Sequence, residues 1–243
     1  AAIVAQCGAA RVRRHGQEGS FVSKVTLDRN GKVLRGEDFI RSVDYFNFGT
    51  YGDDAGTYQS TPAGTDDARF ARFCSSTLAA AGSLYNWRTG RGTTERIYFA
   101  NEESSNEGRV FGVTQNGNAV ELPRLGRFPW ENTVPATRSG DTTLVMGNED
   151  GGTTTSELWA YVGTKERGRN KTVFDKAGLQ NGESHVIAVS DGAGGLIASD
   201  AAYRAAHNKG DKVRFSLSEV PWDATGAVQN AAADTQGTSF DRI

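Results

Sequence analysis

The central part of this sequence contains two stretches rich in apolar and acidic residues, Leu125-Gly-Arg-Phe-Pro-Trp-Glu131 and Thr142-Thr-Leu-Val-Met-Gly-Asn-Glu-Asp150. The first is an apolar turn that places Glu131 directly after Pro129-Trp130. The second is a strand, Thr142 to Met146, with Glu149 and Asp150 at its end. Carboxylates at strand ends suit hard cations, which bind several oxygens on a rigid scaffold. An ordinary acidic turn is the alternative interpretation, because such residues are common in loops.

Short strands separated by turn signals lie on both sides of these stretches. Asn30-Gly31 and Asn116-Gly117 predict hairpin turns, while Val173–Gly182 and Ser199–Asn208 predict short helical pieces. The other predicted strands are Phe21–Leu27, Lys32–Arg35, Phe39–Phe48, Glu95–Ala100, Arg109–Val113, Ala119–Leu122, Glu157–Gly163, His185–Ser190 and Lys212–Leu217. Many strands with few helices predict a single all-β domain: a sandwich, a barrel or a propeller. No tight repeat is visible, so a propeller would be a degenerate one.

Composition limits the possible partners. The chain has 243 residues with 30 glycines and a net charge of −2, from 27 basic and 29 acidic side chains. This balance gives no electrostatic argument for nucleic acid or an anionic membrane as a partner. No apolar run approaches the ~18 residues of a membrane span.

The N-terminal segment, residues 1–20, is basic, and the sequence does not start with Met. It is either the mature end left after removal of a signal peptide or an arbitrary boundary. The two cysteines, Cys7 and Cys74, are compatible with a disulfide in an exported protein. They are equally compatible with two thiols in a reducing compartment.

Several kinds of catalytic site have no support in the sequence. There is no G-x-S-x-G motif and no phosphate-binding glycine loop, and the three histidines are scattered. What remains is an acidic set with one thiol: Cys74, Glu102, Glu103, Glu131, Glu149 and Asp150. Oxygen ligands predict calcium or magnesium, whereas a thiolate in the same set favours a transition metal such as iron.

The order of four motifs resembles the PhoX-type alkaline phosphatase superfamily. The motifs are Arg72-Phe-Cys74-Ser, Asn101-Glu-Glu103, Leu125–Glu131 and Gly147-Asn-Glu-Asp150, within a resemblance that covers roughly residues 70 to 192. Members of this family are exported bacterial β-propeller proteins whose phosphatases bind calcium and iron. The resemblance predicts a degenerate β-propeller, a phosphate ester substrate and a periplasmic or extracellular location.

The resemblance also implies roles for individual residues. Cys74 would bind iron, and the iron and calcium shells would be completed by Glu102 or Glu103, Glu131, and Glu149 or Asp150. The metals would neutralise phosphate oxygens and lower the pKa of a bound oxygen nucleophile. Arg72, Arg124 and Arg127 would add charge-assisted hydrogen bonds to the phosphate, with structural ion pairs as the alternative for each.

Two departures from the family pattern bear on activity. The glycine-rich, Trp-containing segment that follows the Cys in the phosphatases is replaced here by residues 75–81, Ser-Ser-Thr-Leu-Ala-Ala-Ala. Trp130 stands where the family has a His before its metal-binding Glu. These changes motivate a second hypothesis, in which the chain is a non-catalytic, calcium-binding surface or assembly protein on the same scaffold.

Length argues that a propeller would be incomplete. At ~40–50 residues per blade, the chain allows about five blades without long loops, and this chain has long loops. The sequence therefore predicts the N-terminal part of a larger propeller, or one half of a nicked one. We expect a second chain or fragment to cover its open edge near Lys212–Leu217 and Phe240.

Overall fold

The structure is a computed structural model of the chain, and it describes residues 2–6, 19–47, 56–60, 70–103, 108–150, 156–190, 193, 195, 197 and 200–222. Nearly all of its regular structure is β-strand, arranged in three larger sheets and one small hairpin. The all-β prediction is confirmed. Each sheet is open along the strand order found in the described ranges.

The strands follow one another through the sheets with few crossovers. The first sheet, in the order β1-β2-β3, contains β1 (Ala2–Gln6), β2 (Phe21–Leu27) and β3 (Val33–Asp38). The second, in the order β5-β4-β11-β10-β9-β6, contains β4 (Ser42–Phe46), β5 (Tyr58–Ser60), β6 (Phe73–Leu78), β9 (Tyr98–Glu102), β10 (Val110–Val113) and β11 (Asn118–Glu121). The third contains, in chain order, β12 (Trp130–Pro135), β13 (Thr142–Glu149), β14 (Leu158–Thr164), β15 (Glu183–Val189) and β16 (Phe215–Val220). The remaining elements are the hairpin of β7 (Tyr85–Asn86) and β8 (Arg91–Gly92), and the helices η2 (Pro123–Leu125), α1 (Val173–Lys176) and α2 (Asp200–Ala206).

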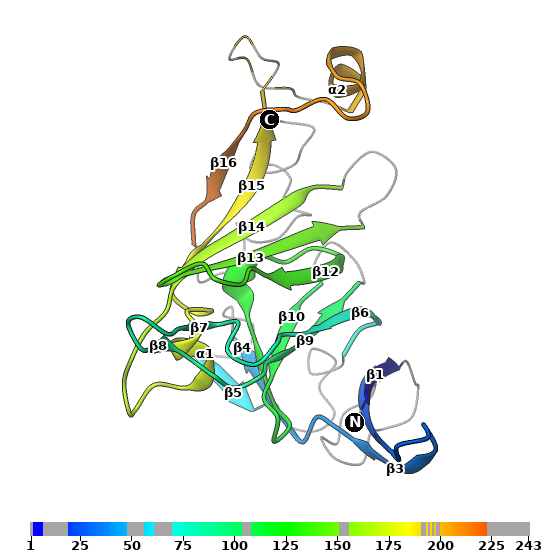
Figure 1. Ribbon diagram of the computed structural model, residues 1–243. Coiled ribbons are helices and arrows are strands. Elements are labelled where there is room, and N and C mark those ends of the chain that lie inside the picture. The colour runs from blue at the N-terminus through cyan, green and yellow to red at the C-terminus, as the bar shows by residue number, and fades with distance from the viewer. Residues whose placement is uncertain are drawn as a thin grey trace.

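The three sheets are stacked as layers, with β1–β3 at the bottom of Figure 1 and β12–β16 above the six-stranded sheet. A large core joins Phe99 of the middle sheet to Trp159 and Tyr161 of the third sheet. A second core joins Phe111, on the other face of the middle sheet, to Val22 of the first. Because both faces of the middle sheet are covered, every residue of β9 and β10 is buried.

The β2–β3 connection shows how the local sequence sets the register. Asn30-Gly31 lies at the tip, and Gly31 has a φ of 84°, a left-handed conformation that glycine adopts readily. Asp28 Oδ1 accepts hydrogen bonds from the backbone N–H groups of Asn30 and Lys32, at 2.8 and 2.9 Å. The hairpin predicted from this turn is confirmed.

Some predicted elements differ from those observed. The stretch from Leu125 to Glu131 is not a simple turn, because η2 comes first and β12 already begins at Trp130. The predicted strand Lys212–Leu217 is shifted along the chain to Phe215–Val220. Cys7, Phe240 and most of the basic segment 1–20 lie outside the described residues. Within the described ranges, no helix combines the length and apolar character that a membrane crossing requires.

Candidate metal centre

Three of the predicted ligands, Glu103, Glu131 and Asp150, meet at the boundary between the second and third sheets. One carboxylate oxygen from each lies within 4.8 Å of the others. Glu103 is buried, Glu131 is half-buried and Asp150 is exposed. No other described group of three or more His, Cys, Asp and Glu side chains converges in this way. The structure thus selects one residue from each acidic pair named in the sequence, together with Glu131.

Backbone hydrogen bonds hold two of these acids beside the start of a neighbouring strand. The N–H of Glu103 donates to the carbonyl of Arg72 at 2.9 Å, and the N–H of Asp150 donates to the carbonyl of Pro129 at 2.9 Å. The third acid, Glu131, occupies a β-bulge in β12, between Trp130 and Asn132 in the register with β13. Bulges change the direction of a side chain, and this one accounts for the position of Glu131 among the acids.

The same local arrangement occurs twice in the chain. Strands β6, β9, β10 and β11 form one antiparallel meander, and β12, β13, β14 and β15 form the next. In each, a buried aromatic residue on the first strand pairs with an acid on the second: Phe73 with Glu102, and Trp130 with Glu149. A bulge follows each aromatic residue, at Cys74 in the first meander and at Glu131 in the second. The centre therefore lies where two equivalent meanders meet, since β12 packs against β6 and β9.

Arg72 adjusts the charge of the centre. Its Nη2 donates to Glu103 Oε1 at 2.8 Å and to the Glu103 carbonyl at 3.0 Å. Three carboxylates and one guanidinium leave a formal charge of about −2 when all are ionised. That charge matches a divalent cation such as calcium, which prefers oxygen ligands.

The crowding of the acids has an electrostatic effect. The pKa of Glu131 is raised, first by a hydrogen bond with the Glu103 side chain and next by burial. The negative charges of Glu103 and Asp150 raise this pKa further, and the positive charge of Arg72 opposes them. A proton therefore reduces the repulsion within this centre, and a bound cation would do the same.

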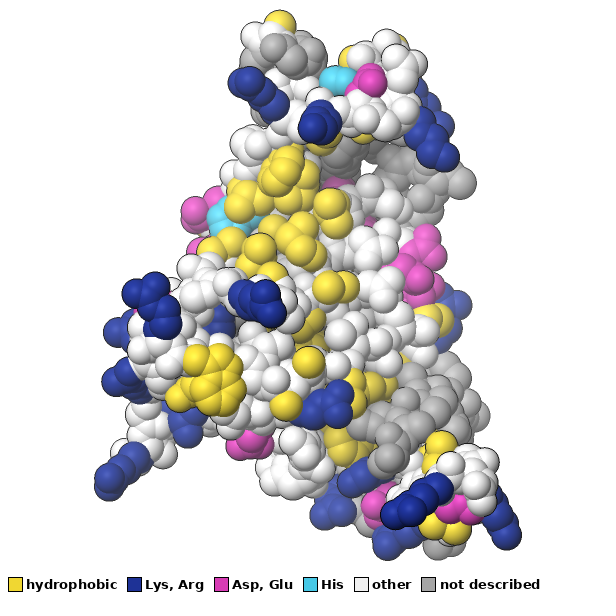
Figure 2. Space-filling model, viewed as in Figure 1, with side chains coloured by type: hydrophobic (Ala, Val, Ile, Leu, Met, Phe, Trp, Pro, Cys, Tyr) yellow, Lys and Arg dark blue, Asp and Glu magenta, His cyan; other side chains and the backbone are white. Residues whose placement is uncertain are grey.

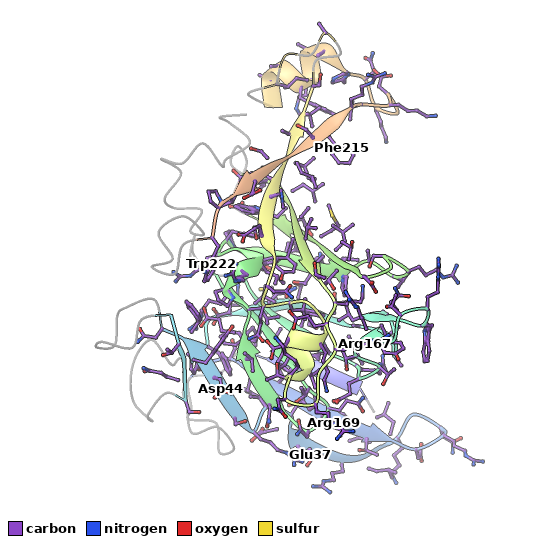
Figure 3. The ribbon with its side chains drawn as sticks, turned by 90° about the vertical axis from the view of Figure 1, so that its left-hand side faces the viewer. Glu37, Asp44, Arg167, Arg169, Phe215 and Trp222 are labelled. Atoms are coloured by element: carbon purple, nitrogen blue, oxygen red, sulfur yellow. The ribbon has the colours of Figure 1, made fainter. Side chains whose placement is uncertain are left out.

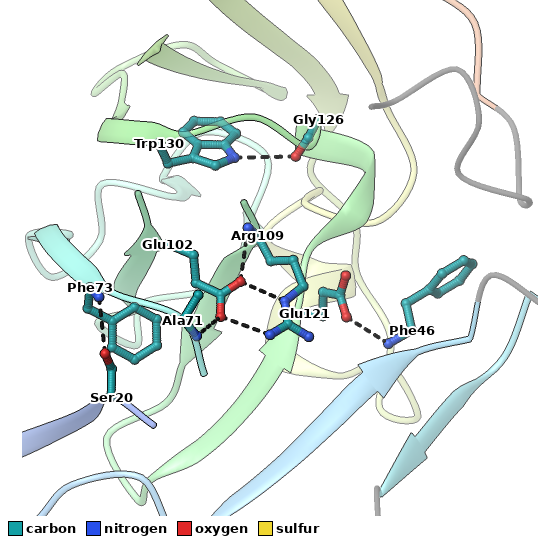
Figure 4. A network of polar contacts seen from close by, with 9 residues as sticks. All are labelled: Ser20, Phe46, Ala71, Phe73, Glu102, Arg109, Glu121, Gly126 and Trp130. Atoms are coloured by element: carbon teal, nitrogen blue, oxygen red, sulfur yellow. Dashed lines mark hydrogen bonds and ion pairs between the residues drawn. The ribbon is translucent and has the colours of Figure 1, made fainter. Parts of the chain in front are cut away.

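Two other predicted ligands make contacts of their own. Glu102 accepts hydrogen bonds from Arg109 Nε at 2.6 Å and Nη2 at 2.8 Å, and from the N–H of Ala71 at 2.7 Å (Figure 4). Burial is the largest single influence on the pKa of Arg109 and lowers it, but the charge of Glu102, the hydrogen bond to Glu102 and the charge of Glu121 act together in the opposite direction, and the net shift is upward. Glu149 is buried and accepts a hydrogen bond from Trp159 Nε1 at 3.3 Å. Both carboxylates thus have donors within the fold.

Cys74 is not a member of the acidic centre. Its side chain is exposed, and it is not among the residues whose ligand atoms converge there. A disulfide between Cys7 and Cys74 concerns a residue outside the described part of the chain. Iron binding by Cys74 stays a prediction.

Each of the predicted phosphate-binding arginines has acidic neighbours of its own in the structure. Arg72 borders the acidic centre, and its side chain is 57% exposed. Arg124 Nη1 lies 3.1 Å from Glu183 Oε1, and its guanidinium stands 4.3 Å from the centre of the Trp222 ring, a residue labelled in Figure 3. Arg127 lies near enough to Glu121 for its charge to lower the pKa of that carboxyl, although burial has the largest effect and raises it.

Sequence reasoning missed the buried network around Arg109. Glu121 Oε2 accepts a hydrogen bond from the N–H of Phe46 at 3.1 Å, and the charge of Arg109 acts on it (Figure 4). In the sequence Arg109 and Glu121 are single charged residues within the predicted strands Arg109–Val113 and Ala119–Leu122, with no motif that distinguishes them from surface residues. The pair of Arg109 and Glu102 lies across the antiparallel pairing of β10 with β9. The bond between Glu121 and the N–H of Phe46 depends on the parallel contact of β11 with β4, which no local pattern encodes.

A scan of protein-family models and searches of curated proteins and of solved structures each return no match to this chain.

Proposed function

We propose that Glu103, Glu131 and Asp150 bind a calcium ion, and that the chain is part of a PhoX-like, metal-dependent phosphoester hydrolase acting outside the cytoplasm. The observation that carries the proposal is the approach of three carboxylate oxygens to within 4.8 Å of one another. Like charges this close are unfavourable without a counter-charge, and calcium takes several oxygen ligands. The hydrolase activity and the location rest on the resemblance of the ordered motifs.

In this proposal the protein supplies positioning and charge. A bound cation would neutralise phosphate oxygens and lower the pKa of a bound oxygen nucleophile. Asp150 and Glu131 keep exposed surface, so a substrate has access to the centre from solvent. Arg72 is placed to donate to a phosphate oxygen, since only part of its guanidinium is used by Glu103.

The repeated meander also supports the propeller interpretation. Successive four-stranded antiparallel sheets with adjacent first strands are typical of propeller blades. Here β6 and β12 are the first strands of two successive meanders, and they pack against each other. We infer that the two meanders are neighbouring blades of a degenerate, incomplete propeller.

A second candidate function is a non-catalytic calcium-binding surface or assembly protein. Trp130 favours it: its indole is 1% exposed and stacks on Phe128 with ring centroids 3.9 Å apart. Its Nε1 donates to the Gly126 carbonyl at 3.3 Å, so this side chain is committed to the core. Cys74, outside the acidic centre, favours the same view, because this scaffold would then hold calcium without iron.

Calcium titration by isothermal calorimetry tests the metal centre. We expect Glu131→Gln to weaken calcium binding at least about tenfold, which corresponds to 1.4 kcal/mol. Glu37→Gln is the matched control, because Glu37 is paired with Arg35 at 2.9 Å on β3. Equal affinity in the wild type and Glu131→Gln would refute the site.

Elemental analysis and hydrolysis of p-nitrophenyl phosphate separate the two candidate functions. Iron bound together with calcium, and activity that falls in Arg72→Ala, favour the hydrolase. Calcium alone, without activity in metal-loaded protein, favours the scaffold.

A further inference from the structure

An open cavity of about 660 Å³ lies between the β7–β8 hairpin and the connection from β12 to β13, and we call it the hairpin cavity. It is lined by residues 80–83, 85–88, 137, 138 and 140. A volume of this size is typical of sites that bind small molecules. The acidic centre lies at the opposite end of the β12–β13 pair, where Trp130 is paired with Glu149. The two places are therefore separate.

Trp87 gives the hairpin cavity a flat aromatic surface. This residue is 76% exposed, which is unusual for so large an apolar side chain. Neighbours nevertheless hold its indole, because a Cβ at Gly82 would lie 3.3 Å from Cζ2 of Trp87, and the ring centroid of Tyr85 lies 4.7 Å away at an angle of 75°. Figure 2 shows a hydrophobic group with basic side chains beside it, at the place where Figure 1 draws β7 and β8. An aromatic ring that is held in place and open to solvent is suited to stacking on a ligand.

Two arginines, Arg88 and Arg138, give the cavity a positive charge. Both are exposed, and the lining contains no Asp or Glu. Within the described part of the chain, neither arginine forms an ion pair. The acid beside the lining, Asp141, accepts a hydrogen bond from Asn86 Nδ2 at 2.7 Å instead. Guanidinium groups without an acidic partner favour an anionic ligand, since their N–H groups bind carboxylate and phosphate oxygens in pairs.

The walls of the cavity are fixed by the fold. Arg138 has a φ of 63°, and no other non-glycine residue among those described has a positive φ. Such a conformation persists where surrounding contacts determine it. The buried Lys165 supplies these contacts, because its Nζ donates to Ser139 Oγ and to the Gly140 carbonyl, both at 3.0 Å. The hydrogen bond to Asp141 joins the same loop to the hairpin, so little ordering is needed when a ligand binds.

We propose that the hairpin cavity binds an acidic sugar, a pyranose ring that carries a carboxylate or a phosphate group. The C–H groups on one face of such a ring are slightly positive, and they stack on the negative face of the Trp87 indole. The anionic group pairs with Arg88 or Arg138. The sugar hydroxyls form hydrogen bonds with Thr137 and with backbone groups of the lining.

Other flat ligands fit this cavity less well. An organic cation is repelled by the two arginines, and a neutral sugar makes no use of their charge. A nucleobase in a protein site is commonly stacked between two side chains, whereas Tyr85 stands at 75° to Trp87 and forms no second parallel wall. The net charge of −2 also provides no long-range attraction for a nucleic acid.

Calorimetric titration of the whole chain tests the site, with trigalacturonate, glucose 6-phosphate and the neutral maltotriose as probes. We expect a Kd of about 1 mM or less for at least one acidic probe, and a Kd at least about tenfold higher for maltotriose. The two acidic probes distinguish a carboxylate from a phosphate as the anionic group. A chelator is present throughout, so that a metal bound at the acidic centre contributes no binding of phosphate.

Substitutions assign the binding to the cavity. Trp87→Ala is expected to raise the Kd of the acidic probe at least about tenfold, whereas Trp87→Phe keeps a flat ring and most of the affinity. The double variant Arg88→Gln/Arg138→Gln is expected to lose the preference for acidic over neutral sugars. Phe215→Ala is the matched control, because Phe215 is an aromatic residue, 62% exposed, on β16. Circular dichroism verifies that each variant is folded, which exposed positions should allow.

Each outcome decides the matter. Weaker binding in Trp87→Ala and in the double arginine variant, with Phe215→Ala unchanged, supports the proposal. Equal affinity for acidic and neutral sugars overturns it, as does the absence of binding with either acidic probe at about 10 mM, tenfold above the expected Kd.

Two further probes complete the test. Adenosine monophosphate that binds more tightly than both acidic sugars would overturn the proposal in favour of a nucleotide. Inorganic phosphate that binds as tightly as glucose 6-phosphate would overturn it in favour of a simple anion site. The inference does not rest on the proposed function, and Glu131→Gln is expected to leave the sugar affinity unchanged.

Discussion

Cys74 and Glu131 occupy the same position in two successive meanders. Each is the bulged residue that follows a buried aromatic residue on the first strand, Phe73 or Trp130. Of these two residues, only Glu131 belongs to the group of Glu103, Glu131 and Asp150 found among the described residues. The first meander contributes Glu103, and not Cys74, to this group. The centre is thus built between meanders rather than within one.

Replacing Cys74 is expected to leave calcium binding intact. Cys74→Ser should change the calcium Kd by less than about twofold, since about 0.4 kcal/mol or less separates such affinities. The reason is that the thiol is exposed and lies outside the group of Glu103, Glu131 and Asp150. Isothermal calorimetry of Cys74→Ser and Glu131→Gln under the same conditions gives the comparison. A tenfold loss of calcium affinity in Cys74→Ser would mean that the thiol is a ligand.

The raised pKa of Glu131 predicts a pH dependence of stability. The folded state retains a proton that the unfolded chain releases near the usual glutamate pKa, so this group stabilises the fold most at low pH. That contribution is lost as pH rises through the raised pKa, where the carboxylates repel one another. Without calcium, Glu131→Gln should therefore have a higher Tm than wild type at about pH 8 and a similar one at about pH 4.

Added calcium should make the Tm of the wild type higher than the Tm of Glu131→Gln. At about 100 times its Kd, a ligand raises the free energy of unfolding by about 2.7 kcal/mol. Thermal unfolding of wild type and Glu131→Gln with calcium and with a chelator measures both effects. A wild-type Tm that does not change with added calcium at any pH would contradict the prediction.

Breaking the buried pair of Glu102 and Arg109 should be strongly destabilising. Arg109→Ala leaves the Glu102 carboxylate, 2% exposed, without its charged partner, and we expect a loss of about 3–5 kcal/mol. The exposed pair Arg35–Glu37 is the control, and Arg35→Ala should cost about 0–1 kcal/mol. Urea denaturation measures both, and equal losses would show that burial of the first pair has no energetic consequence.

Gly147 makes room for Trp130. A Cβ at this position would lie 2.1 Å from Trp130 Cζ3, so Gly147→Ala should displace the indole and cost about 1–3 kcal/mol or more. A Cβ at Gly36, on β3, would meet no atom within 4 Å, and the φ of this residue lies outside the left-handed region. Gly36→Ala should therefore be neutral or stabilise the fold by about 0.4–1 kcal/mol. Chemical denaturation measures the free energy of unfolding of both variants. An unchanged value in Gly147→Ala would mean that the Trp130 ring can move aside without cost.

Local patterns were sufficient for the elements whose causes are local. The turn at Asn30-Gly31 and the alternation of Phe21–Leu27 predict their hairpin, because turn chemistry and side-chain period act within a few residues. The acids Glu103, Glu131 and Asp150 are also visible in the sequence. What the sequence left open was which member of each acidic pair would face the centre.

Tertiary structure decided that choice through register. Glu102 and Glu149 pair with Phe73 and Trp130 and point into the fold, so the next residue in each case points to the centre. Side chains alternate along a strand, and a shift of one residue would exchange the two acids. The strands β6 and β9 are separated in the chain by β7 and β8, and both pairings contain a bulge that shifts the register. One linear pattern does not contain these features. The contact of Glu121 with the N–H of Phe46 was decided by pairing of the distant strands β4 and β11.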